Sequence, residues 1–528
     1  MKNSFFLIIP PQRKSTEHIK NFQEGALKHW VEELPTANPS LVTRLFHDFI
    51  VEFNQIEMEP ALRLDALEIL RPSCLVIEDY LRARLMQANF PKTAGDQKIM
   101  EILFAIEKEF ALAYWMVVRE LTSKEVGWFQ SKNTTLAIQR CIKSLSAIVV
   151  TFCSLYRGVP DWVWIDLHSL YKLSEVLNKQ ANKIPAEFNH TVKMTTIETS
   201  YQQILLFSLV QPSRLMQKEI LPVYFFLETV SPYLQMENKA IAHYATQCLL
   251  CMDDDKPPSF QQHSSAVADS SVRYLNFDKL FSAFKFKDRF TASGLVRFSS
   301  IGVQQGDYSK VSVDLLDYIE QRWRAHPLPE RMVFSDRLDR FVALGLEAAF
   351  NLKNAVFSAT EPETEFLVQT ASERSLIGDF NHLSVLSVGS LISIRKVDAP
   401  EHLRSLGIVS KLVSFKYENK MRFEVDLLAE HFYAVSFEYL EEKKPLQRKK
   451  ALLYGVKVQG EEEKSFIIIE SFMLKDGAIV RMFMMNEDYP IIIKDRKNIG
   501  LGYWRFECRR MPETMATLSN KKQGYDFI

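Results

Sequence analysis

Four short stretches between residues 366 and 429 decide the fold of this chain. They read FLVQTASERSLIGD at 366–379, VGSLISIR at 388–395, LGIVSKLVSF at 406–415 and RFEVDLLA at 422–429. Apolar and polar residues alternate from Ser390 to Arg395, which is the pattern of a half-buried β-strand. Gly378, Gly389 and Gly407 separate the apolar runs. The region therefore predicts several short strands joined by turns.

Three phrases in this region resemble the core of a PilZ-type β-barrel. They are VGSL at 388–391, LGIVSKL at 406–412 and EVDLLA at 424–429. PilZ barrels are receptor modules for cyclic di-GMP, so the resemblance implies an antiparallel barrel with that nucleotide as its candidate ligand.

The first half of the chain predicts helices instead. Residues 1–255 contain four glycines and the rest of the chain contains thirteen, and glycine destabilises helix interiors. The sequence Asn38-Pro39-Ser40 begins a helix with apolar residues on one face, and a second helix begins at Pro60 and ends or kinks at Arg71-Pro72. Further helices are predicted at 73–89, 96–121, 134–156, 163–181, 194–209, 215–233 and 237–252. With no strict repeat period, they indicate a solenoid-like or bundle-like array.

Four phrases in the helical half resemble a family of Gram-negative bacterial proteins. They are ELPTANP at 33–39, LEILRP at 67–72, WIDLHSLY at 164–171 and LFSLVQPSRLMQKEI at 206–220. Proteins of that family join a long helical region to a C-terminal PilZ-like domain. The resemblance implies the same architecture here.

The sequence as a whole predicts an α+β multidomain protein, a helical array followed by a PilZ-like antiparallel β-barrel. We expect the array at 1–252 and a polar, Pro- and Ser-rich linker at 253–272. A mixed α/β segment follows at 273–330, in which 311–324 is an amphipathic helix, and the barrel with its extension occupies 331–528. A strand over 340–352 is expected to open the barrel.

The first candidate binding element is an arginine-rich approach to the barrel. The resemblance implies an RxxxR motif whose guanidinium groups bind phosphate and stack on guanine, tasks that suit a planar, permanent cation. The chain has Arg331, Arg337 and Arg340 instead, which gives RxxR with one arginine farther upstream. Either these arginines line a phosphate site, or they pair with Asp336 and Asp339 on a solvated loop.

The second candidate element is the segment from Thr370 to Ser375, which aligns with the (D/N)xSxxG motif of PilZ barrels. Ser372 matches, whereas Thr370 replaces the acidic or amide residue and Ser375 replaces glycine. A threonine hydroxyl bonds a base edge less strongly than a carboxylate. The side chain at 375 is expected to crowd a ligand or to strain a backbone with positive φ. Arg374 lies in the same segment and completes the set of candidate ligand-binding residues.

Composition excludes several other functions. Lys+Arg and Asp+Glu are equal at 65 each, so no net charge favours a nucleic acid polymer. No apolar run approaches the roughly 20 residues of a membrane span, and the short apolar run at 5–9 stops at a proline pair, so we expect a cytoplasmic protein.

Phosphate-loop, zincin and nucleophile-elbow motifs are missing, which predicts no enzyme, no catalytic residue and no metal or other cofactor. Cys248 and Cys251 form a lone CxxC and are expected to be small buried residues on a helix.

Two functional hypotheses remain. The first is a signalling or adaptor protein whose PilZ-like module binds cyclic di-GMP weakly or has lost it. The second is a scaffold that binds no nucleotide and recruits protein partners through its helical array, whose length offers an extended surface.

Overall fold

The computed structural model describes most of the chain. The described residues are 5–87, 90–123, 131–186, 193–262, 271–285, 311–327, 332–354, 365–380, 386–415, 420–439, 448–457, 463–470 and 473–513. They form two compact units. The first unit holds 1–88, 92–212 and 217–328, and the second holds 89–91, 213–216 and 329–528.

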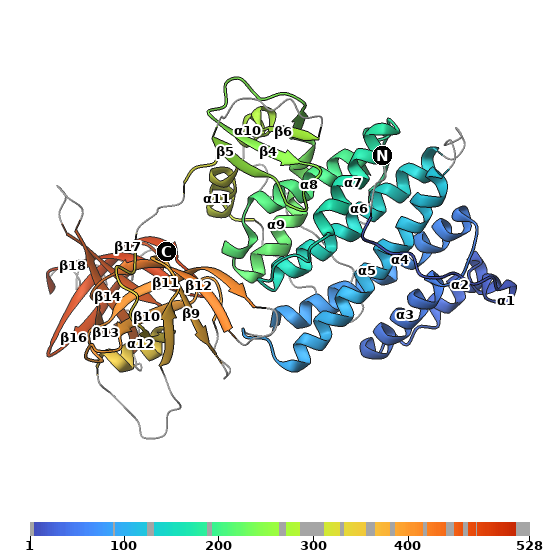
Figure 1. Ribbon diagram of the computed structural model, residues 1–528. Coiled ribbons are helices and arrows are strands. Elements are labelled where there is room, and N and C mark those ends of the chain that lie inside the picture. The colour runs from blue at the N-terminus through green and yellow to red at the C-terminus, as the bar shows by residue number, and fades with distance from the viewer. Residues whose placement is uncertain are drawn as a thin grey trace, which may run out of the picture. The chain divides into compact units, whose positions relative to one another are not determined.

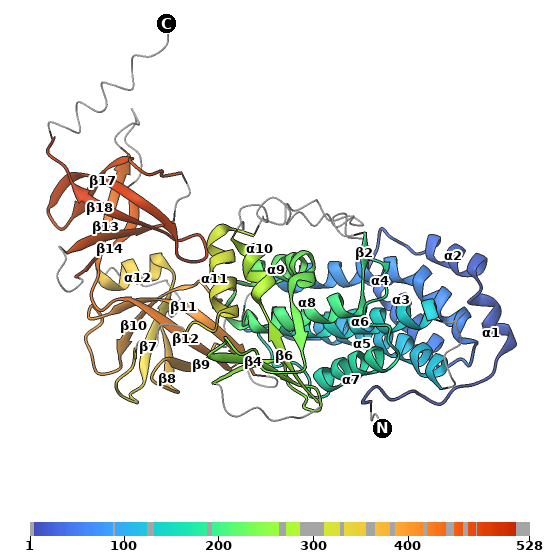
Figure 2. The same cartoon turned by 90° about the horizontal axis from the view of Figure 1, so that it is seen from above.

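The first unit is mainly helical, as predicted, and its long helices pack side by side (Figures 1 and 2). Its helices are α1 (Thr16–Asn21), α2 (Glu24–Glu32), α3 (Pro39–Asn54), α4 (Pro60–Gln87), α5 (Ala94–Thr122), α6 (Ser131–Ser154), α7 (Val163–Val176), α8 (Ile197–Leu209), α9 (Gln217–Val230), α10 (Asp278–Phe284) and α11 (Val313–Trp323). Helix α6 contacts α4, α5, α7, α8 and α9, so it lies at the centre of the unit. By length and composition α6 is apolar enough to cross a membrane, but most of it is buried among these helices.

Local signals explain where the helices begin. The Asn38 side chain accepts a hydrogen bond from the Leu41 N–H at 3.2 Å, and Pro39 occupies the first turn of α3. The helix predicted from Pro60 does not end at Arg71-Pro72, because α4 continues through Pro72. Leu67 and Leu70 before the proline and Cys74 and Ile77 after it are all buried. Their packing outweighs the hydrogen bond that the proline removes.

A cluster of charged side chains lies between α4, α5 and α6. Arg82 donates to Glu107 Oε1 at 2.6 Å and to Glu78 Oε2 at 3.0 Å, and all three side chains are at most 8% exposed. The Thr151 hydroxyl also donates to Glu107 Oε1, at 2.6 Å. Burial raises the pKa of Glu107 to about 7, although Arg82 opposes the shift. The second oxygen of Glu107 accepts no hydrogen bond from the described residues, so its charge is incompletely compensated.

Stability of the helical unit is therefore expected to fall as pH rises from 5.5 to 8. A carboxyl whose folded pKa lies above its unfolded value stabilises the fold below the unfolded pKa, and this contribution is lost as pH rises through about 7. Replacing Glu107 with glutamine should reduce the loss by on the order of 1 kcal/mol. Urea titrations followed by circular dichroism at 222 nm would measure this. An equal pH dependence in both proteins would contradict it, and Glu101→Gln, at an exposed position of the same helix, is the control.

The predicted helix at 237–252 is wrong, because this part of the chain forms strands. Strands β3 (Gln235–Glu237), β4 (Thr246–Cys251), β5 (Ser259–Gln262) and β6 (Val272–Asn276) make an antiparallel sheet in the order β3-β6-β4-β5. Cys248 is buried and Cys251 partly buried, but both lie on β4 and not on a helix, and each has a free thiol. A short ladder of β1 (Ile184–Pro185) and β2 (Met194–Thr195) lies elsewhere in the unit.

The described part of the expected linker at 253–272 is also structured. Asp255 accepts hydrogen bonds from the Trp162 N–H and, at 2.9 Å, from the Ile165 N–H. These amides open α7, where Trp162 has a φ of 99° and offers no side-chain cap. The Lys256 carbonyl oxygen lies 2.9 Å from Nε2 of His168. Residues 263–270 of the linker and 286–310 of the mixed segment lie outside the described residues.

The second unit contains closed antiparallel barrels, as Figure 1 shows. The first barrel has the order β10-β11-β12-β9-β8-β7. Its strands are β7 (Arg340–Leu344), β8 (Phe366–Thr370), β9 (Ser375–Asp379), β10 (Leu391–Lys396), β11 (Ser405–Ser414) and β12 (Lys420–Ala429). The predicted strand at 340–352 is right only at its start, because helix α12 (Leu346–Lys353) follows β7.

A second six-stranded barrel follows where a single barrel with an extension was expected. Its order is β13-β14-β15-β18-β17-β16. Its strands are β13 (Tyr433–Tyr439), β14 (Lys449–Val456), β15 (Lys464–Ile469), β16 (Ile479–Met484), β17 (Glu487–Asn498) and β18 (Trp504–Arg510). The barrel has its own apolar core, which includes Phe437, Ile467, Ile491 and Phe506.

The barrels pack against each other through a shared apolar cluster. Leu452 and Ile468 from the second barrel meet Leu406 from the first, and α12 covers the same cluster. At the edge of this contact, the Leu501 N–H donates to the Gly389 carbonyl oxygen at 3.0 Å. A Cβ added to Gly500 would lie 2.1 Å from that oxygen. The glycine of the VGSL phrase therefore lies at the joint between the barrels.

Candidate functional site

The turn from β8 to β9 carries the predicted Thr370–Ser375 element, and its serines hold it in shape. Ser372 Oγ accepts hydrogen bonds from the N–H groups of Arg374 at 3.3 Å and Ser375 at 3.1 Å. The hydroxyl oxygens of Ser372 and Ser375 lie 2.6 Å apart. Ser375 begins β9 and is not among the residues with positive φ, so the expected backbone strain at this position is absent.

Arg340 lies against this turn and is 4% exposed. Its Nη1 donates to the Thr370 hydroxyl and, at 2.6 Å, to the Leu338 carbonyl oxygen, which also accepts a 2.8 Å hydrogen bond from Thr370 Oγ1. Its Nη2 donates to Asp336 Oδ1 at 2.6 Å, and its guanidinium carbon lies 4.6 Å from the centre of the Phe334 ring. The structure thus brings together an arginine of the first element and the threonine of the second.

Asp336 is bound by a second cation that sequence reasoning missed. Lys396 Nζ lies 2.8 Å from Asp336 Oδ2, and the Leu338 N–H donates to Oδ1 at 3.2 Å. The hydrogen bond from Lys396, followed by that from Arg340, lowers the pKa of Asp336 to about 2. Lys396 pairs with Arg340 across the β10–β7 ladder, which puts both side chains on one face. Only the strand register reveals this neighbour.

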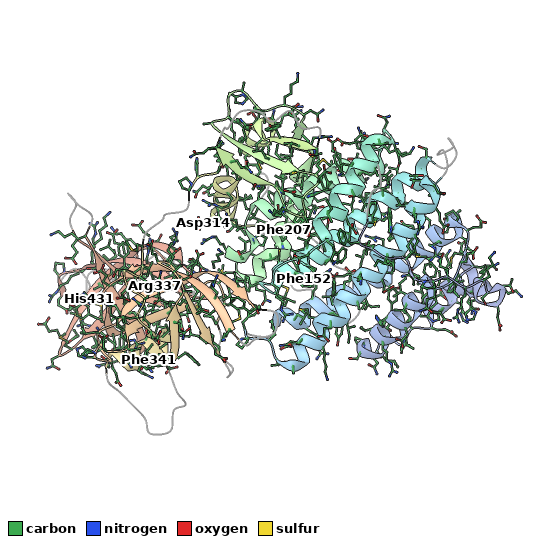
Figure 3. All side chains as sticks on the ribbon, viewed as in Figure 1. Phe152, Phe207, Asp314, Arg337, Phe341 and His431 are labelled. Atoms are coloured by element: carbon green, nitrogen blue, oxygen red, sulfur yellow. The ribbon has the colours of Figure 1, made fainter. Side chains whose placement is uncertain are left out.

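The segment that precedes β7 is hydrogen-bonded to the β8–β9 turn. The N–H groups of Val333 and Phe334 donate to the Glu373 carbonyl oxygen at 3.0 and 2.9 Å. Phe334 is buried, whereas Arg337, which Figure 3 labels, is exposed. We call residues 332–340 the approach segment, because it leads into the barrel and covers the turn.

The remaining candidate arginines are not all gathered at the turn. Arg374 directs Nη2 to Asp426 Oδ1 on β12 at 3.4 Å, and its side chain is 21% exposed. Arg331 lies outside the described residues. Among the described residues the structure therefore assembles Arg340, Thr370, Ser372 and Ser375, with Arg374 turned to a neighbouring strand.

Carboxylates compensate the cations around the turn. Asp336 is shared by Arg340 and Lys396, and Glu424 on β12 lies 2.9 Å from Lys411 Nζ. The register places Glu424 directly opposite Ser375. Within the described part of the chain, no group of three or more His, Cys, Asp or Glu could hold a metal ion. The arrangement is suited to holding an anionic group between an arginine and a lysine, and that position is taken by the protein's own carboxylate.

Comparison with known proteins finds that the helical half is similar to one family of receptors. Residues 25–241 match the family model described as "Cyclic-di-GMP receptor FimW, N-terminal domain". This match, together with the barrels of the C-terminal half, confirms the resemblance to proteins that join a helical region to a PilZ-like domain.

A particular relative is the Cyclic-di-GMP receptor FimW of Pseudomonas aeruginosa. It is 23% identical to this chain over 215 residues, which cover 41% of the chain and 35% of the relative. The chain thus spans about a third of the length of that relative. Among solved structures, "MrkH, A novel c-di-GMP dependence transcription regulatory factor" is matched over 38% of this chain and 96% of that one, at 6% identity. The TM-score of that match is 0.14.

Proposed function

We propose that this protein is a cytoplasmic signalling or adaptor protein that binds cyclic di-GMP at the β8–β9 turn of its first barrel. The observation that supports this most is the contact of Arg340 with Thr370, which unites the two sequence elements at one place. The match of residues 25–241 to a cyclic-di-GMP receptor family supports the same ligand. The role is one of binding, without catalysis.

The affinity is proposed to be weak. Arg340 is buried and already bonded to Thr370, Leu338 and Asp336. The hydroxyl of Thr370 is neutral, so it cannot make the charged hydrogen bond that a carboxylate would make to the edge of guanine. Each missing charged contact costs on the order of 1–3 kcal/mol, so two of them weaken binding by roughly 10²-fold or more.

Calorimetric titration of the 528-residue chain with cyclic di-GMP at moderate salt tests the proposal. We expect weak binding that Arg337→Ala reduces about threefold to tenfold, since this exposed cation lies on the approach segment. Arg340→Ala should remove binding. Because Arg340 is buried, Arg337→Ala is the variant that tests the loss of a cation without disturbing a buried group. Arg448→Ala is the control, because Arg448 is exposed on the second barrel and stacks on Phe483 at 3.8 Å. Undetectable binding by the unchanged protein would refute the ligand assignment.

One observation favours a second function. At the turn, Arg340 and Lys396 face Asp336 while Arg374 faces Asp426, so each of these cations has a carboxylate partner without a ligand. A barrel whose cations are paired with its own carboxylates suits a scaffold that binds no nucleotide and recruits a protein partner through its helical unit. Undetectable nucleotide binding in the titration above would favour this alternative.

A further inference from the structure

The carboxylate of Asp336 has the charge and contacts that a phosphodiester would have in the same place. Its oxygens each face a different cation, Oδ1 at 2.6 Å from Arg340 and Oδ2 at 2.8 Å from Lys396. A phosphodiester carries one negative charge over its non-bridging oxygens, and a planar guanidinium with an ammonium is a common pair of donors for it.

Asp336 is held next to these cations because the segment that carries it is fixed at both ends. It lies on the approach segment, which is fastened at one end by the amides of Val333 and Phe334 and at the other by β7. Arg340 under Asp336 is 4% exposed. A phosphate group therefore binds Nη2 of Arg340 only if the carboxylate of Asp336 moves away from it.

We infer that Arg340 and Lys396 form a phosphodiester-binding pair and that Asp336 occupies it as a built-in competitor. This rests on the proposed function for the identity of the nucleotide, but the anion site itself follows from the contacts. Lys396 becomes a ligand-binding residue outside both sequence elements. Its side chain is 49% exposed, so it remains accessible to a ligand.

The test compares cyclic di-GMP affinity in Asp336→Asn with that in Asp339→Asn. Both changes remove one negative charge from the approach segment. Asp339 is exposed, however, and it is its backbone carbonyl oxygen that accepts a hydrogen bond, from the Val397 N–H. We expect Asp336→Asn to raise affinity tenfold or more and Asp339→Asn to change it less than about threefold. Adding Lys396→Gln to Asp336→Asn should cancel most of the gain. Equal gains from both asparagine variants, or a gain that survives Lys396→Gln, would overturn the inference.

A second measurement keeps the inference testable if no variant binds cyclic di-GMP, a result that would refute the proposed function. Diethyl phosphate, a simple phosphodiester, is added at millimolar concentration and the melting temperature is recorded. It should raise the melting temperature of Asp336→Asn, but not that of the unchanged protein or of the variant that also carries Lys396→Gln. Equal shifts in all three proteins would refute the anion site.

Discussion

Replacing Arg82 with leucine is expected to lower the free energy of unfolding of the helical unit by about 3–5 kcal/mol. Arg82 is the cation between Glu78 and Glu107, whose side chains are 7% and 0% exposed. Removing it leaves buried carboxylates without their ionic partner, which costs far more than the loss of a surface ion pair. Urea unfolding followed by circular dichroism at 222 nm would measure the change.

Two further variants separate charge from packing. Arg84→Leu is the matched control, since Arg84 lies on the same helix but is exposed. Its effect should stay within about 0.5 kcal/mol. Adding Glu107→Gln to Arg82→Leu should recover part of the stability, because it removes one of the stranded charges. If Arg82→Leu proves as mild as Arg84→Leu, the buried ion cluster does not stabilise the unit as described.

Replacing Gly500 with alanine is expected to loosen the joint between the barrels, at a cost of about 1–3 kcal/mol. The new Cβ would lie 2.1 Å from the Gly389 carbonyl oxygen, which is backbone and has no rotamer to adopt. The strand ends must separate, which breaks the hydrogen bond from Leu501 to Gly389. Hydrogen exchange of the Leu501 amide should become faster, and the melting temperature of the second unit should fall.

The control for this variant is Gly502→Ala. Gly502 has a φ of 78°, but a Cβ there meets no atom within 4 Å. It therefore reports backbone strain of about 1 kcal/mol without a steric clash. Slow exchange of the Leu501 amide in Gly500→Ala would show that the close approach is not needed to hold the barrels together.

Sequence periodicity predicted the helices well where apolar residues recur over several turns, as in α3 and α5. It failed at 246–251, where TQCLLC is a short apolar run that fits a buried helix or a strand equally well. The alternative that a helix ends at Pro72 also failed, because a local helix-breaking signal is weaker than the packing of a long helix.

The barrels show a different limit of sequence reasoning. Alternation identifies strands, but it does not say which strands close on one another. The chain passes from β12 to β13 across Glu430–Phe432, a connection too short to look like a domain boundary. At the candidate site, Arg340 and Thr370 were predicted together from motif resemblance. Lys396 was missed because its place beside Arg340 depends on strand register, which the sequence alone does not fix.

The hydrogen bonds from the start of α7 to Asp255 span about 90 residues of chain. A truncated protein that stops at 252 would lack this carboxylate, the Lys256 carbonyl that meets His168, and two strands of the sheet. In this fragment the first N–H groups of α7 would lack the Asp255 acceptor, and Trp162, whose backbone is in the left-handed region, offers no side-chain cap. The boundary that composition suggests would thus cut through the first compact unit. A fragment meant to capture a binding partner should run to about residue 328, where the first compact unit ends.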